Sequence, residues 1–183
     1  MIILSTHGKV LLEAPGDLPG ADLRGRSLGG ADLTAATLDG ADFSEAHLLS
    51  ARLDDASARH VRFTRANMEG LSCMDACLDG ADFTDADLYW CIAFGASFRA
   101  ATLVRASLLG ADLKEVNFAG TDLTDADLGT DNVGGATQLQ GANLSDARLA
   151  RTHLTGAHYD RLTRFPDGFD PQAAGMILVD TAA

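Results

Sequence analysis

The chain has 183 residues, of which 26 are acidic and 14 are basic, so its formal net charge is −12. Such a chain offers little positive surface for nucleic acid, and its apolar runs are far shorter than the roughly 20 residues that span a bilayer. Three cysteines without paired spacing indicate a reducing compartment and no metal site. Length, charge and cysteine content therefore predict one cytoplasmic domain without a membrane segment and argue against direct nucleic-acid binding.

The N-terminal segment, residues 1–15, is predicted to form a hairpin. Two apolar runs, residues 2–4 and residues 10–12, flank Gly8 and Lys9. Gly8-Lys9 does not form a phosphate loop, because Val10 stands where Ser or Thr is needed. We expect the hairpin to cap the open end of the repeat structure that follows, since an exposed end invites edge-to-edge pairing.

Residues 16–160 repeat a unit of five residues. Between Leu18 and Tyr159 there are 29 central positions, of which 18 are Leu and five are Phe; Val133 is one of the others. A five-residue step would spread these side chains around a helix, whereas in extended backbone the central residue and the small residue two before it face the same side. The remaining two residues, often polar and then Gly, must turn the chain. The repeat therefore predicts an all-β solenoid whose stacked coils share one core.

Four units match the pattern Ala-Asp/Asn-Leu literally. They are Ala21-Asp22-Leu23, Ala31-Asp32-Leu33, Ala111-Asp112-Leu113 and Ala142-Asn143-Leu144. In these units the chain resembles the pentapeptide repeat family, over about four fifths of its length. The resemblance implies a right-handed quadrilateral parallel β-helix with four units per coil, hence about seven coils. It also implies a non-catalytic protein that binds other proteins.

One side of the solenoid is predicted to be acidic. It carries Asp22, Asp42, Glu45, Asp82, Asp85, Asp122, Asp125 and Asp146, interrupted by Arg24, Arg62, Arg65 and Arg105. Several family members imitate DNA and bind type II topoisomerases, so the resemblance implies DNA gyrase as a partner and resistance to topoisomerase poisons. The alternative is that these carboxylates solvate the surface and that Asp before a central residue bonds the backbone at the corner.

Residues 89–94 place large apolar side chains at outward positions. A shift of one coil, 20 residues, adds neighbours, and the predicted patch comprises Met74, Tyr89, Trp90, Ile92, Phe94 and Leu109. A contiguous apolar patch is typical of a contact surface, and Tyr and Trp are frequent anchors there. The second functional hypothesis is therefore a scaffold protein that binds an unknown partner through this patch. In the competing interpretation Cys91 and Ala93 underfill the interior, and Phe94 or Ile92 turns inward.

The repeat slips by one residue near position 138. Gln138 stands where a central residue is expected, and Leu139 continues the pattern. We expect residues 134–137 to form a bulged corner, and we expect no long projecting loop.

Residues 161–183 leave the repeat and form a C-terminal tail. Asp170 is placed to cap a short helix that has Pro171 at its first position. The tail either covers the last coil or joins two copies of the chain. The dimer contact would comprise Phe165, Phe169, Met176, Ile177, Leu178 and Val179.

No catalytic, cofactor-binding or metal site is expected. The five histidines show no spacing that converges on a metal or a nucleophile. Paired acidic residues fall on a convex exterior, whereas catalytic carboxylates need a cleft that shifts their pKa. The sequence therefore predicts a protein that is not an enzyme and uses no cofactor.

Overall fold

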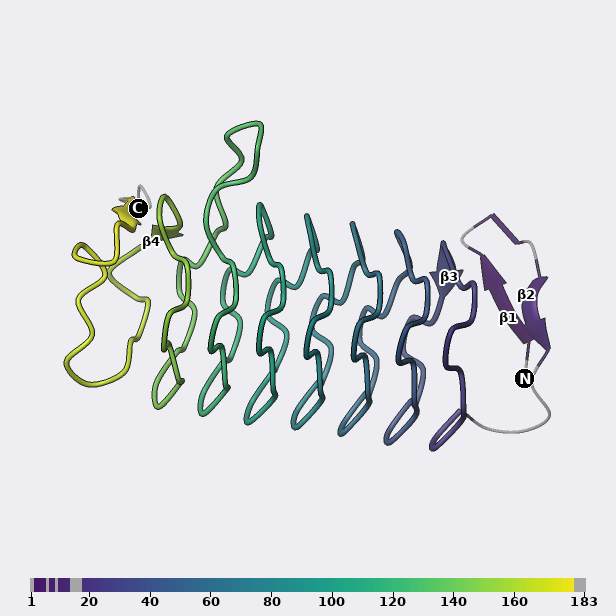
Figure 1. The fold of residues 1–183 in the computed structure, drawn as a ribbon. Helices are drawn as coiled ribbons and strands as arrows, with labels where there is room; N and C mark the ends of the chain where they lie inside the picture. The colour runs from purple at the N-terminus through teal and green to yellow at the C-terminus, as the bar shows by residue number, and fades with distance from the viewer. Residues whose placement is uncertain (1, 6, 9, 14–17, 180–183) are drawn as a thin grey trace.

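The computed structural model describes residues 2–5, 7–8, 10–13 and 18–179, and these form a rod of stacked coils (Figure 1). Parallel β-bridges join residues 20 positions apart, beginning with Asp22 and Asp42. Central residues donate their N–H groups to the next coil, as Phe43 does to the carbonyl oxygen of Arg62 at 2.7 Å. Most sides contribute a single bridge to each neighbouring coil, so regular strands are few although the backbone pairing is continuous.

The interior is filled by the central residues and by the small residues two positions before them. Phe43, Phe63 and Phe83 stack on one side of the core, with ring centroids 5.3 and 5.0 Å apart. Phe98 and Phe118 continue the aromatic series on the adjacent side. These five side chains are fully buried, which confirms the predicted core.

The corners explain the glycines of the repeat. The second residue after the central position adopts a left-handed backbone in most units, with φ of 71° at Gly40 and 67° at Gly80. Glycine adopts this conformation without steric cost. The same corner conformation also holds larger residues, including Asp85 and Trp90 with φ of 58° and 55°. The fold therefore leaves the corner side chain open to choice, at a modest conformational cost.

The N-terminal end is capped by a hairpin. Strand β1 (Ile2–Ser5) pairs antiparallel with β2 (Val10–Glu13), as the sequence predicts. Strand β1 also pairs antiparallel with β3 (Ala31–Asp32), so the hairpin lies against the first coils (Figure 1).

The C-terminal tail adds a strand to the last coil. Strand β5 (Ile177–Leu178) pairs parallel with β4 (His158–Tyr159). The predicted helix is wrong, because the described part of the chain contains no helix. Asp170 does accept bonds from the N–H groups of Gln172 and Ala173, but Gly175, with φ of 78°, ends the turn and directs the chain into β5. No helix in the described residues is long and apolar enough to cross a membrane.

A loop interrupts the coils between Leu128 and Leu139. Bridges before it join residues 20 apart, whereas Asp122 pairs with Arg148, 26 positions later, so six residues leave the solenoid. Thr130 pairs antiparallel with Ala136 at the base of this loop, which projects from the rod in green in Figure 1. Val133 is 76% exposed. The prediction of a one-residue bulge, with Val133 in the core and no projecting loop, is wrong because a complete unit leaves the coil with the extra residue.

Candidate protein-interaction surfaces

One corner of the acidic side carries an alternating column of charges, which we call the charge ladder. It consists of Glu45, Arg65, Asp85, Arg105, Asp125 and Arg151. Arg65 Nη1 lies 2.9 Å from Glu45 Oε1, and Arg105 Nε lies 2.6 Å from Asp85 Oδ1. Arg151 Nε lies 2.6 Å from Asp125 Oδ1. Each carboxylate of the ladder therefore has an arginine from the next coil.

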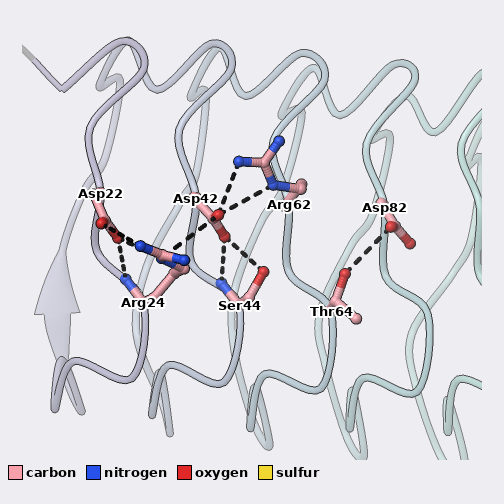
Figure 2. Close-up of polar contacts among 7 residues, drawn as sticks. All are labelled: Asp22, Arg24, Asp42, Ser44, Arg62, Thr64 and Asp82. Carbon is pink, nitrogen blue, oxygen red and sulfur yellow. Dashed lines mark hydrogen bonds and ion pairs between the residues drawn. The ribbon is translucent and has the colours of Figure 1, made fainter.

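The other carboxylates of the acidic side also have partners within the chain (Figure 2). Arg24 pairs with Asp22 at 2.7 Å, and Arg62 pairs with Asp42 at 2.8 Å. The remaining contacts are those of Arg148 with Asp122 and of the Thr64 and Thr84 hydroxyls with Asp82. The sequence analysis missed Arg148 and Arg151 because the loop moves all later units by one side.

For the same reason Asp146 does not lie where the sequence analysis placed it. Asn143 pairs with Asn117, and the N–H of Gly120 donates to the carbonyl oxygen of Ser145. Asp146 therefore stands at the corner occupied by Gly120 in the preceding coil, and not with the charge ladder.

Arginines and hydroxyls lower the pKa of several carboxylates of the acidic side. The hydrogen bond from Arg24 lowers the pKa of Asp22 to about 2. Burial raises the pKa of Asp42, but hydrogen bonds from Ser44 and Arg62 outweigh burial, and the pKa is lowered. The hydrogen bond from Arg105 lowers the pKa of Asp85. The side is thus charged but largely compensated.

Aspartates before central residues also shape the corners. The Oδ1 atoms of Asp42, Asp82 and Asp122 accept bonds of 2.9 to 3.0 Å from the backbone N–H group two residues later. This confirms the structural interpretation of these aspartates, because such a bond fixes the turn that the repeat requires.

The predicted apolar patch, comprising Met74, Tyr89, Trp90, Ile92, Phe94 and Leu109, lies on two adjacent sides and the corner between them. Trp90 and Ile92 are 47% and 44% exposed, and Met74 and Phe94 are each 38% exposed. Tyr89 and Leu109 are half-buried. Because Ile92 and Phe94 point outward while Cys91 and Ala93 fill the interior positions, the interpretation that they repair the core is wrong.

The projecting loop, residues 129–135, is fastened to the apolar patch. The Trp90 ring passes over Gly110 of the next coil, where a Cβ atom would lie 2.6 Å from the ring. Beyond Gly110, Trp90 Nε1 donates to Asp131 Oδ2 at 2.6 Å. Tyr89 stacks on Trp90, with centroids 4.7 Å apart, and its hydroxyl donates to Asn132 Oδ1 at 3.1 Å. The aromatic pair thus holds a loop that starts some 40 residues later.

Asp131 organises this loop from within. Its Oδ1 accepts the N–H groups of Val133 and Gly135 at 2.9 and 2.6 Å. The hydrogen bond from Trp90, supported by these backbone donors, lowers the pKa of Asp131. At the base, the buried Thr137 hydroxyl lies 3.0 Å from the Leu108 carbonyl oxygen. The loop therefore has a defined shape and presents Val133 at its exposed tip.

Five carboxylates flank the apolar patch, and we call them the flanking carboxylates. They are Asp55, Glu69, Asp75, Asp87 and Glu115. Within the described residues no lysine or arginine nitrogen lies within 4.0 Å of any of them. Burial and then the charges of Asp131, Glu69 and Asp87 raise the pKa of Tyr89. Uncompensated negative charge therefore surrounds the apolar patch, whereas most carboxylates of the acidic side have an arginine partner.

The tail residues divide into a buried and an exposed group. Phe165 packs edge-on against Tyr159 and stacks on Phe169, with centroids 5.6 and 5.2 Å apart. Met176 is buried. These contacts cover the last coil, as one of the two alternatives predicts. Ile177 and Leu178 stay exposed, Val179 is half-buried, and a dimer contact through them stays a prediction.

Titratable residues in the described part of the chain form no cluster of three or more that could hold a metal ion. Burial raises the pKa of Cys91 to about 12, and burial also raises that of Cys73. These two thiols therefore stay protonated in the core and have no nucleophilic character.

Comparisons with known proteins agree with the repeat. A family model described as pentapeptide repeats matches in eight copies, over residues 17–48, 46–85, 94–129 and 136–158. The stretches it leaves out within the rod, 86–93 and 130–135, contain Trp90 and Asp131, the residues that join the loop to the patch.

Among solved structures, full-length QnrB1, a plasmid-mediated fluoroquinolone resistance protein, matches with a TM-score of 0.63 and 18% identity, over 89% of this chain and 86% of that protein. HetL, involved in heterocyst differentiation regulation in the cyanobacterium Nostoc sp. strain PCC 7120, is 28% identical over 88% of this chain and 78% of its own, with a TM-score of 0.38. No curated protein sequence matches. The family model and the QnrB1 fold imply a right-handed β-helix.

Proposed function

Because the chain belongs to the pentapeptide repeat family, we propose that it is a non-catalytic, cytoplasmic protein-binding module. Its contact surface comprises the apolar patch and the loop 129–135. One observation carries this proposal: the two stretches of the rod that the family model leaves unmatched meet in space, through the bond from Trp90 to Asp131.

The chemistry of this surface supports binding. The exposed side chains of Met74, Ile92 and Phe94 do not contribute to the core, which is filled by other residues. Exposed apolar groups that form one patch are typical of contact surfaces, and aromatic residues dominate binding energies there. The loop is already fastened to Tyr89 and Trp90, which lowers the entropy lost when a partner binds.

Photo-crosslinking in the native host tests the proposal. A benzoylphenylalanine residue at position 94 is expected to crosslink a defined partner, whereas the same residue at position 99 is not. Phe94 and Arg99 are exposed and occupy equivalent places in consecutive units, so they differ only in the side of the rod they face. Equal crosslinking at both positions, or none at either, contradicts the proposal.

The second candidate is a DNA-mimicking modulator of DNA gyrase that confers resistance to topoisomerase poisons. Its support is the net charge of −12 on a rod, together with the column of Asp55, Asp75 and Glu115, whose charges are uncompensated. The acidic side itself supports it less, because the charge ladder neutralises the carboxylates there. QnrB1, whose fold the chain shares, is described as a fluoroquinolone resistance protein.

A supercoiling assay with purified gyrase, with and without a fluoroquinolone, tests this candidate. Inhibition or drug rescue is expected to disappear in the triple variant Asp55→Lys, Asp75→Lys, Glu115→Lys. The matched variant Asp82→Lys, Asp85→Lys, Asp125→Lys changes the net charge equally on the acidic side. No effect of the unaltered protein up to tens of micromolar, or equal effects of both variants, contradicts mimicry by this column.

A homodimer through the tail is also proposed. Ile177 and Leu178 are exposed on β5, the last strand of the rod, where a second copy is able to pack. A single monomeric species in light scattering at micromolar concentration contradicts it.

A further inference from the structure

We propose that the apolar patch recognises a protein segment that combines apolar side chains with lysines or arginines. This inference rests on the proposed function and names the chemistry of the partner. Its basis is the coincidence, at one corner of the rod, of exposed apolar groups and uncompensated carboxylates.

The flanking carboxylates lie on both edges of the patch. Asp75 directly follows Met74, and Asp55 and Glu115 occupy the same corner in other coils. On the opposite edge, Glu69 lies one coil from Tyr89, and Asp87 precedes Tyr89 on the same side. Neighbouring coils are about 4.8 Å apart, so cations set among apolar groups reach these carboxylates while their neighbours cover the patch.

The basic residues on the two sides that carry the patch already have carboxylate partners. Between residues 49 and 115, the basic residues on the two sides of the patch are Arg52 and Lys114. Arg52 pairs with Asp54 at 3.0 Å, and Lys114 pairs with Asp112 at 3.1 Å. Asp54 is also bonded to Ser72 and to the N–H group of Met74, so it is buried and not offered to a partner. The flanking carboxylates therefore have no cationic partner among the described residues, and a partner protein is able to supply one.

Charge decides among the possible occupants. Nucleic acids and anionic membranes are repelled by the flanking carboxylates, and so is a second copy of a chain with a net charge of −12. A neutral apolar segment would bury the apolar patch but would form no ion pairs with the flanking carboxylates. A cationic amphipathic segment is able to bury the apolar patch and to pair with the flanking carboxylates. Its charges also increase the association rate and the specificity of binding.

Trp90 provides the test, because it is the single tryptophan of the chain and lies in the patch. Its fluorescence is titrated with three synthetic amphipathic peptides of equal length, one of Lys and Leu, one of Glu and Leu, and one of Lys and Ser. We expect saturable binding of the Lys/Leu peptide alone, with affinity falling about tenfold between 50 and 300 mM NaCl.

Variants locate the binding. Asp75→Lys is expected to weaken binding of the Lys/Leu peptide at least about fivefold at 50 mM NaCl, since it reverses a charge beside Met74. Asp146→Lys makes the same change at another corner, with φ of 58° against 55° at Asp75, and is expected to change affinity less than about twofold. Arg65 and Arg151 show that this corner backbone accepts a long basic side chain. Phe94→Ser is expected to abolish binding through loss of apolar contact.

Three results overturn the inference: binding of the Glu/Leu peptide as tight as that of the Lys/Leu peptide, equal weakening by Asp75→Lys and Asp146→Lys, or no binding of any peptide. The proposed function is judged separately by crosslinking from position 94. If that position captures a partner through an acidic segment, the inference fails while the proposed function stands. If positions 94 and 99 crosslink equally, the proposed function itself fails.

Discussion

The acidic side and the side that carries Met74 and Phe94 belong to the same coils but distribute their side chains in opposite ways. Behind the acidic side the core holds the stacked rings of Phe43, Phe63 and Phe83, and its surface holds ion pairs. Behind the other side the core holds residues as small as Ala93, and the surface holds large apolar groups. The repeat constrains the interior residues and the backbone of the corners, so the outward and corner side chains are free to differ from one side to the next.

The two sides also differ in where their polar groups find partners. On the acidic side each arginine and nearly every carboxylate is satisfied within the chain. Around the apolar patch Tyr89 and Trp90 bond to the loop 129–135, whereas the flanking carboxylates have no lysine or arginine partner among the described residues. A side whose charges are paired within the chain contributes to stability and solubility. A side with exposed apolar side chains and unpaired carboxylates is the better candidate for binding a partner.

The same substitution on the two sides gives the largest expected contrast. Phe63→Ala is expected to lower the free energy of unfolding by about 3–5 kcal/mol, because the buried ring stacks on two neighbours. Phe94→Ala is expected to cost less than about 1 kcal/mol, because the ring is already partly in water. Urea denaturation followed by circular dichroism measures both. Equal losses show that Phe94 is part of the core and contradict the comparison.

The core and the corners could be predicted from the sequence because each five-residue unit has the same pattern of small, large and turn-forming residues. The loop could not, since the coil gains six residues there, one more than a period, and Val133 takes the place of a central residue. Its one sequence signal is indirect: Trp90 stands between Gly70 and Gly110, one coil away on either side, which leaves room for a ring to cross to another coil. The acidic side was predicted by composition, but its arginine partners after the loop depend on a register that only the structure supplies.

Acid is expected to destabilise the folded chain in part through the acidic side. The pKa values of Asp22, Asp42, Asp85 and Asp125 are lowered in the folded chain, so their ionised forms stabilise it. This contribution is complete above the unfolded value near 3.8 and is lost as pH falls toward about 2, the pKa of Asp22. Thermal melts should therefore give a Tm that is level from pH 7 to 5 and falls by several degrees between pH 4 and 2.5. A Tm at pH 3 equal to that at pH 6 contradicts this prediction.

Release of the loop is expected to have a local effect. Asp131→Ala removes the acceptor of Trp90 Nε1 and of the N–H groups of Val133 and Gly135. Amide exchange at these two positions should accelerate by about 10- to 100-fold, because opening no longer breaks these bonds. Trp90→Phe removes a single donor and should give a smaller acceleration. The amide of Phe63 in the core is the control, and acceleration there would show that the whole rod has loosened.

Charge reversal at matched corners is expected to have the smallest effect, and it tests the comparison most directly. Asp85 and Asp75 occupy the same place in their units, with φ of 58° and 55°. Asp85→Arg sets three arginines in line with Arg65 and Arg105, so it should lower the Tm by about 2–4 °C at low salt. Asp75→Arg relieves the repulsion from Asp55 and should leave the Tm unchanged or slightly higher.

Both shifts should shrink in 0.5 M NaCl, where the Debye length is about 4 Å and exposed charges hardly interact. If both reversals lower the Tm equally, then the carboxylates beside the apolar patch are compensated within the chain, like those of the charge ladder. In that case they do not need a cation from a partner. If only Asp85→Arg does, the flanking carboxylates give the isolated rod no stability, and a role in binding is what accounts for their presence beside an exposed apolar surface.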